Sequence, residues 1–108
     1  MSNAEICRLS AVTLAQNIRS KLLSPSAVVE AVLERMAELD PALHAFCTPT
    51  PELARASAKR VEDALARGDA LGPLAGVPVG IKDLVCTKGI KTVSGSFAYE
   101  NYVPEEDD

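Results

Sequence analysis

The chain of 108 residues is 47% hydrophobic and 24% charged. This composition is typical of a folded domain and excludes a disordered chain, while the length allows one small domain at most. No apolar stretch reaches the roughly 18–20 residues of a membrane span, and the start Met-Ser-Asn-Ala-Glu lacks the pattern of a signal peptide, so we expect a cytoplasmic protein without a membrane segment.

The net charge of −4 comes from the end of the sequence. Eleven Lys and Arg stand against fifteen Asp and Glu, and the four acidic residues 105–108 account for the whole difference. The rest of the chain has no basic stripe, so we expect no direct binding to nucleic acid. A terminal acidic run of this kind is expected to be solvated and nothing more.

Cysteine and histidine do not indicate a metal site. Cys7, Cys47 and Cys86 lie far apart and form no Cys-x-x-Cys pair, which argues against a disulfide framework or a zinc site. We therefore expect buried, reduced thiols. His44 is the single histidine and cannot complete a metal cluster alone, so we assign it no role.

Three helices are predicted in the first 70 residues. Each begins at a polar N-cap, and two have proline in the first turn: Ser10, Ser24-Pro25 and Thr50-Pro51. We expect Pro41 to end the second helix and Gly68 the third. Apolar residues recur along one face of each: Leu14, Ile18, Leu22; Val28, Val29, Val32, Leu33, Met36; Ala54, Ala58, Val61, Leu65. On the opposite face of the third helix, Arg55, Lys59 and Glu62 are expected to be solvated.

Two strands are predicted between and after these helices. Residues 44–48 are short and apolar enough for one strand. Residues 71–85 begin with Gly and Pro, and then Val77, Val79 and Ile81 alternate with a period of two, which predicts a strand with one buried face. Residues 87–104 are rich in Gly, Ser and Thr and are expected to form a loop.

Lys82 follows this alternation at the expected end of the strand. From the pattern alone, a surface lysine with its stem laid along apolar neighbours is the commoner situation. A lysine beside the small residue Gly80 also has room for a substrate. The pattern by itself leaves both interpretations open.

The chain resembles the amidase signature family of serine hydrolases in two stretches. Its last part is similar to the first characteristic block of that family, GPLAGVPVGIKDLVCTKGIKTVSGSFAYENYVPEEDD, residues 72–108. Its middle part is similar to the family's N-terminal helical region, LSPSAVVEAVLERMAELDPALHAF, residues 23–46. The match is most specific at residues 76–83, GVPVGIKD, and at residues 87–92, TKGIKT.

The resemblance implies an α/β fold of which residues 1–108 form the N-terminal part of a single amidase domain. A helical region, residues 1–70, would lead into a mixed central β-sheet with surrounding helices, and residues 71–108 would supply its first strand and the active-site lysine block. Lys82 would be the catalytic lysine of a Ser–cisSer–Lys triad. Ser94 and Ser96 do not match the triad serines, which we expect further along a longer chain. This triad requires no metal and no organic cofactor.

A lysine base must be neutral to accept a proton. A free lysine has a pKa of about 10.4, and lowering this to about 7 disfavours the ammonium form by roughly 4.6 kcal/mol, which burial can supply. A carboxylate beside the ammonium acts in the opposite sense. Asp83 adjoins Lys82 in the sequence, but neighbouring side chains of a strand point to opposite faces, so we predict that Asp83 points away from Lys82 and forms local hydrogen bonds.

These expectations lead to three hypotheses about function. The first is a hydrolase that cleaves the C–N bond of a small-molecule carboxamide, with the 108 residues inactive alone. The second, within the same family, is the amidase (A) component of a glutamyl- or aspartyl-tRNA amidotransferase. The third is a non-catalytic helical interaction fragment, because exposed apolar faces need a partner. That partner would be the remainder of the amidase domain or a second copy.

Overall fold

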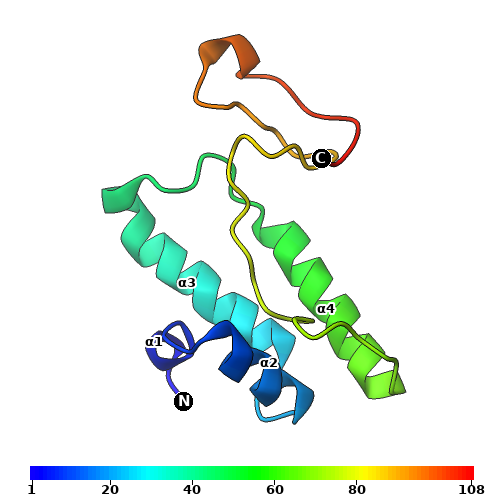
Figure 1. Cartoon of the computed structure of the whole chain (residues 1–108). Helices are drawn as coiled ribbons and strands as arrows, with labels where there is room; N and C mark the ends of the chain where they lie inside the picture. The colour runs from blue at the N-terminus through cyan, green and yellow to red at the C-terminus, as the bar shows by residue number, and fades with distance from the viewer. The chain divides into compact units, whose positions relative to one another are not determined.

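The structure, a computed structural model, describes all 108 residues and is helical with very little strand. It contains four α-helices and one short 3₁₀ turn: α1 (Asn3–Ile6), α2 (Ala11–Arg19), α3 (Pro25–Leu43), α4 (Pro51–Arg67) and η1 (Phe97–Tyr99) (Figure 1). The one β-type pairing is an isolated bridge between Thr87 and Ile90. None of the helices combines the length and the apolar character needed to cross a membrane.

The residues gather in two compact units. The helical unit comprises residues 1–43 and 50–78, and the loop unit comprises residues 44–49 and 79–108. The helical unit contains all four α-helices, and the loop unit contains Lys82 and the residues around it. Each unit is described by itself below.

Two of the three predicted N-caps are confirmed by their hydrogen bonds, and one predicted stop is confirmed by its backbone conformation. The Ser10 hydroxyl accepts from the N–H of Thr13 at 3.1 Å, and the Ser24 hydroxyl accepts from the N–H of Ala27 at 3.1 Å. Gly68 ends α4 with φ +77, in the left-handed region that glycine enters without steric cost. These signals act within a few residues of the chain and can therefore be recognised in the sequence.

Other boundaries differ from the prediction. Pro41 lies inside α3, which continues to Leu43. The helix ends where His44 turns left-handed at φ +50. Thr50 precedes α4 but makes no side-chain cap bond. Leu22 is 68% exposed, because α2 has already ended at Arg19.

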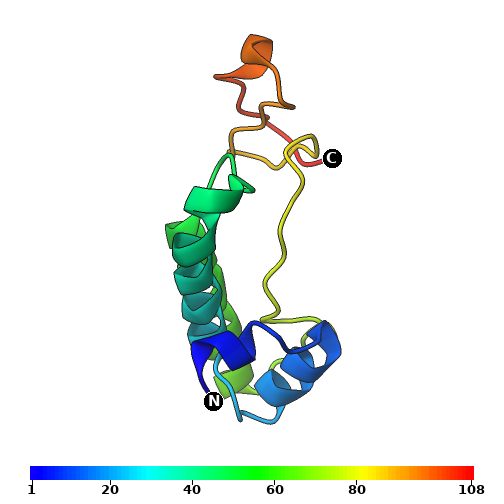
Figure 2. The ribbon, with the colours of Figure 1, turned by 90° about the vertical axis from the view of Figure 1, so that its left-hand side faces the viewer.

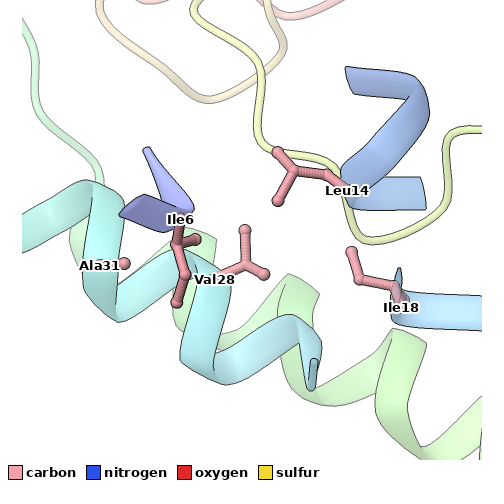
Figure 3. Close-up of a cluster of buried hydrophobic side chains, with 5 residues drawn as sticks. All are labelled: Ile6, Leu14, Ile18, Val28 and Ala31. Atoms are coloured by element: carbon pink, nitrogen blue, oxygen red, sulfur yellow. The ribbon is translucent and has the colours of Figure 1, made fainter. Parts of the chain in front are cut away.

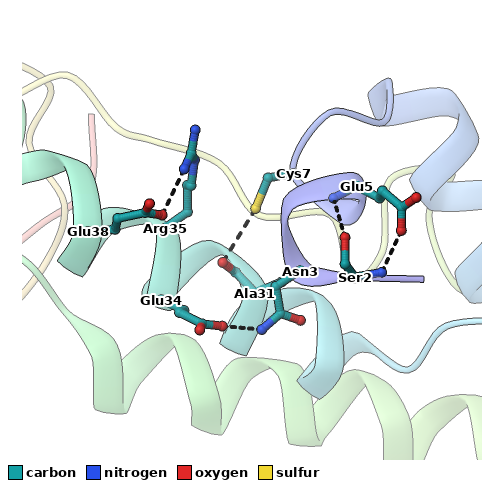
Figure 4. Close-up of polar contacts among 8 residues, drawn as sticks. All are labelled: Ser2, Asn3, Glu5, Cys7, Ala31, Glu34, Arg35 and Glu38. Atoms are coloured by element: carbon teal, nitrogen blue, oxygen red, sulfur yellow. Dashed lines mark hydrogen bonds and ion pairs between the residues drawn. The ribbon is translucent and has the colours of Figure 1, made fainter.

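The helix α1 has no counterpart in the sequence prediction. The Ser2 hydroxyl accepts from the N–H of Glu5, and the Glu5 carboxylate accepts from the N–H of Ser2 at 2.7 Å, which forms a reciprocal capping box (Figure 4). Asn3 donates to Glu34, and the Cys7 thiol donates to the carbonyl of Ala31 at 3.4 Å. These contacts join α1 and the residue after it to α3.

The core of the helical unit is a small cluster of aliphatic side chains from three helices. It is made of Ile6, Leu14, Ile18, Val28 and Ala31 (Figure 3). Partly buried apolar residues pack around it: Cys7, Leu9, Leu23, Leu65 and Val77. Because Val77 belongs to this set, the segment that follows α4 lies against the helices and completes their core.

Helices α3 and α4 pack against each other (Figures 1 and 2). Polar contacts reinforce this packing and correct the expectation of a merely solvated face on α4. The Glu62 carboxylate accepts from the N–H of Ser26 at 2.9 Å, in the first turn of α3. Arg55 forms an ion pair with Glu30 at 2.6 Å. Lys59 pairs only with Asp63 on its own helix.

Neither expected strand is formed. Residues 44–48 contain no strand, and Val79 and Ile81 are 78% and 53% exposed and belong to no ladder. A strand is stabilised by hydrogen bonds to a neighbouring strand, and the 108 residues contain none to pair with. The alternating pattern is therefore present in the sequence while the ladder it predicts is absent.

The three cysteines are free thiols. Cys7 and Cys86 are half-buried, whereas Cys47 is exposed, which corrects the expectation that all three are buried. Cys47 lies in the segment between α3 and α4.

Candidate functional site

Lys82 begins a tight turn in the loop unit. Its carbonyl accepts from the N–H of Val85 at 2.9 Å, which closes the turn over Asp83 and Leu84. The Lys82 side chain is exposed, and no ion pair joins its ammonium to a carboxylate. The burial that a neutral lysine requires is therefore not supplied by these 108 residues.

Asp83 forms local hydrogen bonds, as the sequence predicts. Its Oδ1 accepts from the N–H of Val93 at 3.1 Å, and its carbonyl accepts from the N–H of Ser94 at 2.9 Å. Its Oδ2 is enclosed and has no hydrogen-bond partner. The carboxylate is directed to the chain near Val93 and forms no ion pair with the Lys82 ammonium.

The segment that Asp83 contacts is a sharp corner. Ser94 and Gly95 are both left-handed, with φ of +51 and +67. The N–H of Ser96 donates to the carbonyl of Val93 at 2.9 Å, and the Ser96 hydroxyl accepts from the N–H of Ala98 to begin η1. Ser94 and Ser96 are therefore loop residues, as the sequence predicts.

The acidic end of the chain is not merely solvated, which corrects the expectation for residues 105–108. Asp108 exchanges two hydrogen bonds with Cys86: its carboxylate accepts from the Cys86 N–H at 2.7 Å, and its own N–H donates to the Cys86 carbonyl at 3.0 Å. The Asp107 carboxylate accepts from the N–H of Lys88 at 2.7 Å. Sequence reasoning missed these contacts because a charge run carries no signal for the distant N–H groups it will meet.

Two further hydrogen bonds close the loop unit on itself. The N–H of Gly89 donates to the carbonyl of Pro104 at 2.9 Å, and the N–H of Thr92 donates to the carbonyl of Tyr102 at 3.0 Å. Thr92 is 3% exposed and is the one buried polar side chain of the molecule. Residues 86–92 and 102–108 thus lie side by side in the loop unit (Figures 1 and 2).

The helical unit has a small cleft of its own, of about 160 Å³. Its two charged side chains are already engaged, since Arg19 donates to the carbonyl of Pro73 at 3.1 Å and Asp69 pairs with Arg67 at 2.9 Å. The remaining lining is apolar or small. This cleft therefore offers no group available for acid–base or nucleophilic chemistry.

The block around Lys82 is shared with known proteins. The sequence profile of the amidase family matches residues 27–108, which make up most of the chain and include the Lys82 turn and the corner that Asp83 holds. The chain belongs to the amidase family.

Two curated relatives, both the A component of a glutamyl-tRNA(Gln) amidotransferase, illustrate the similarity. The protein from Prochlorococcus marinus (strain MIT 9303) is 47% identical over 89 residues, which cover 82% of this chain and 18% of the relative. The protein from Carboxydothermus hydrogenoformans (strain ATCC BAA-161 / DSM 6008 / Z-2901) is 41% identical over 103 residues, which cover 95% of this chain and 21% of that protein. The chain therefore spans about a fifth of the length of the curated relatives it matches.

A solved structure agrees with this assignment. It was described as an unexpected vestigial protein complex that reveals the evolutionary origins of an s-triazine catabolic enzyme. One of its chains superposes with a TM-score of 0.87 at 32% sequence identity, covering 92% of this chain and 22% of that chain. The fold described above is therefore one that a family member adopts within a much longer chain.

Proposed function

We propose that the protein is an amidase-type hydrolase that cleaves the C–N bond of a small-molecule carboxamide, and that Lys82 is its catalytic base. The observation that carries the proposal is the family match over residues 27–108, which contains the Lys82 turn. Lys82 would act through a Ser–cisSer–Lys triad. The two triad serines would be residues other than Ser94 and Ser96. Ser94 lies in the corner before η1, and the Ser96 hydroxyl caps the start of η1.

The proposed chemistry places a clear demand on the surroundings of Lys82. A lysine accepts a proton only when it is neutral, and its ordinary pKa of about 10.4 keeps it charged at neutral pH. Here the side chain is exposed. The proposal therefore requires further structure to cover Lys82, so that desolvation lowers its pKa and a serine hydroxyl comes within reach.

The further structure that covers Lys82 would also complete the fold. We propose that residues 1–108 are the N-terminal part of one α/β amidase domain, and that Val79 and Ile81 enter a mixed sheet when neighbouring strands are present. The exposure of these two residues and the TM-score of 0.87 to a chain of which this one covers 22% support this placement. The covering partner would be the remainder of the domain or a second copy.

A second candidate function is the amidase (A) component of a tRNA-dependent amidotransferase. The identities of 47% and 41% to the two glutamyl-tRNA(Gln) amidotransferase proteins favour it. Both candidates share the first step, in which an amide loses its nitrogen as ammonia. They differ in the fate of that ammonia, which a hydrolase releases and an amidotransferase passes to another acyl group.

The test is ammonia release by the protein expressed from its complete reading frame. Primary carboxamides, including glutamine and asparagine, are the substrates. The released ammonia is measured in a coupled assay with glutamate dehydrogenase. Release from a simple carboxamide without any tRNA supports the hydrolase. Release only from glutamine or asparagine, and only with misacylated tRNA and added partner proteins, supports the amidotransferase component. Absence of release under both conditions contradicts both.

A further inference from the structure

Two consecutive N–H groups of one corner are bound by a single residue, Asp83. Its Oδ1 accepts from Val93 and its carbonyl accepts from Ser94, at 3.1 and 2.9 Å. One acceptor belongs to the side chain and the other to the main chain. Asp83 therefore fixes both its own backbone and its carboxylate against residues 93–94.

The corner needs such support because of its backbone conformation. Ser94 has φ +51, a region that residues with a Cβ enter at a steric cost. Strained conformations persist where the surrounding structure holds them. The two bonds to Asp83 supply that restraint at the strained residue and at the one before it.

On the other side, Asp83 is joined directly to Lys82. The turn closed by the Lys82 carbonyl and the Val85 N–H places Asp83 at its second position. Any displacement of Asp83 relative to the corner therefore moves the backbone from which the Lys82 side chain extends.

We infer that Asp83 is the positioning residue for Lys82: by its hydrogen bonds to Val93 and Ser94 it fixes the turn that carries the lysine, and it does so without pairing with the ammonium. This inference rests on the proposed function. An ion pair would stabilise the charged ammonium and oppose its use as a base. The geometry separates the two tasks, because the carboxylate is occupied at Val93 and the ammonium remains free.

Two variants of Asp83 separate the role of its side-chain oxygen as a hydrogen-bond acceptor from the role of its negative charge. Asp83→Asn keeps an oxygen that accepts from Val93, and its amide group takes the place of Oδ2, which has no partner. Asp83→Ala removes the side-chain acceptor altogether. Asp63→Ala is the matched control, because Asp63 is an exposed aspartate that pairs only with Lys59 on the same helix.

The experiment measures kcat, KM and the pH dependence of kcat for amide hydrolysis by the protein expressed from its complete reading frame. For Asp83→Ala we expect kcat to fall by roughly 100-fold, which is the order of effect for a small misplacement of a catalytic group, while KM stays within about twofold. We expect the acidic limb of the profile to move to higher pH, because a displaced Lys82 is more solvated. Asp83→Asn should retain most of kcat, and Asp63→Ala all of it.

A second measurement distinguishes misfolding of the Asp83→Ala variant from the local loss of its hydrogen bond. Amide hydrogen exchange at Val93 and Ser94 reports the two bonds directly, and we expect Asp83→Ala to lose protection at Val93 while helix α3 keeps its own. If Asp83→Ala does not fold, Asp83→Asn decides, because it retains the acceptor.

Three results would overturn the inference or its foundation. Loss of activity in Asp83→Asn equal to that in Asp83→Ala would assign the effect to charge instead of position. A lower kcat with an unmoved acidic limb would reduce Asp83 to a purely structural residue. Full activity of Lys82→Ala would defeat the proposed function itself, which separates that failure from a failure at Asp83.

Discussion

At the scale of single residues, Gly76 shows how close packing and backbone conformation act together. Its φ is +86, and a Cβ added to it would lie 3.1 Å from Ile18 and 3.3 Å from Pro25. Gly68 has a similar φ of +77 but open space around it, and Gly72 has open space without a positive φ. A comparison of the three glycines therefore separates the effect of backbone strain from the effect of side-chain crowding.

We predict a graded response to alanine at these three positions. Gly68→Ala should destabilise the protein by about 1 kcal/mol through strain alone, and Gly76→Ala by about 2–3 kcal/mol because crowding of Ile18 is added. Gly72→Ala should be neutral or stabilising by about 0.5 kcal/mol. Urea denaturation of the intact protein measures all three. Equal effects at positions 68 and 76 would show that the contact with Ile18 is not tight.

At the scale of the elements, one contact between α3 and α4 is made by the Glu62 carboxylate of α4, which accepts a hydrogen bond from the first turn of α3. Hydrogen bonds from Ser26 lower the pKa of Glu62 from its ordinary value of 4.5. Because the pKa is lower in the folded state than in the unfolded state, the contribution of Glu62 is present in full above about pH 4.5 and is lost as the pH falls through the lowered value.

We therefore predict that Glu62→Gln changes the pH dependence of stability. At pH 7 the variant should be less stable by about 0.5 kcal/mol, because the negative charge near the N-terminus of α3 is gone. The difference from the wild type should shrink at a low pH below the lowered pKa of Glu62, where the wild-type carboxyl is protonated. Thermal unfolding at both pH values measures it, with Glu106→Gln, an exposed carboxyl at the chain end, as control. A difference that persists unchanged at low pH would exclude the charge as its cause.

The same elements show why the sequence predicted some features and missed others. Ser10, Ser24 and Gly68 act on N–H and C=O groups within four residues, so their effect can be recognised locally. Glu62 acts on Ser26, and Asp108 on Cys86, across more than twenty residues in each case. No periodicity or cap pattern encodes such a distance, and the contacts appear only once the elements are packed.

At the site the division is similar. The motif around Lys82 points to this residue and its neighbour Asp83, and the local hydrogen bonding predicted for Asp83 is confirmed, in a turn instead of a strand. The alternation of apolar residues before Lys82 predicted a strand that is not formed, because its hydrogen-bond partners would have to come from other strands. The corner at residues 93–95 carries only a Gly-Ser signal in the sequence, and its link to Asp83 is evident only in the structure.

At the scale of the whole molecule, the loop unit exposes several large apolar side chains. Val79 is 78% and Phe97 92% exposed, and Ile81 and Leu84 are also exposed. Exposed apolar surface of this kind favours association. We predict that residues 1–108 produced alone do not hydrolyse amides and associate in sedimentation velocity experiments as their concentration is raised. A monodisperse monomer at high concentration would contradict the view that this apolar surface packs against further structure or a second copy.

We propose that Lys82 is the base of an amidase. The most direct measurement is the rate of ammonia release from a carboxamide by Lys82→Ala and by Lys91→Ala, both in the protein expressed from its complete reading frame. Lys91 is an exposed lysine of the same loop unit. We expect a loss of at least about 100-fold for Lys82→Ala, as when a general base is removed, and wild-type turnover for Lys91→Ala. Wild-type turnover by Lys82→Ala would contradict it.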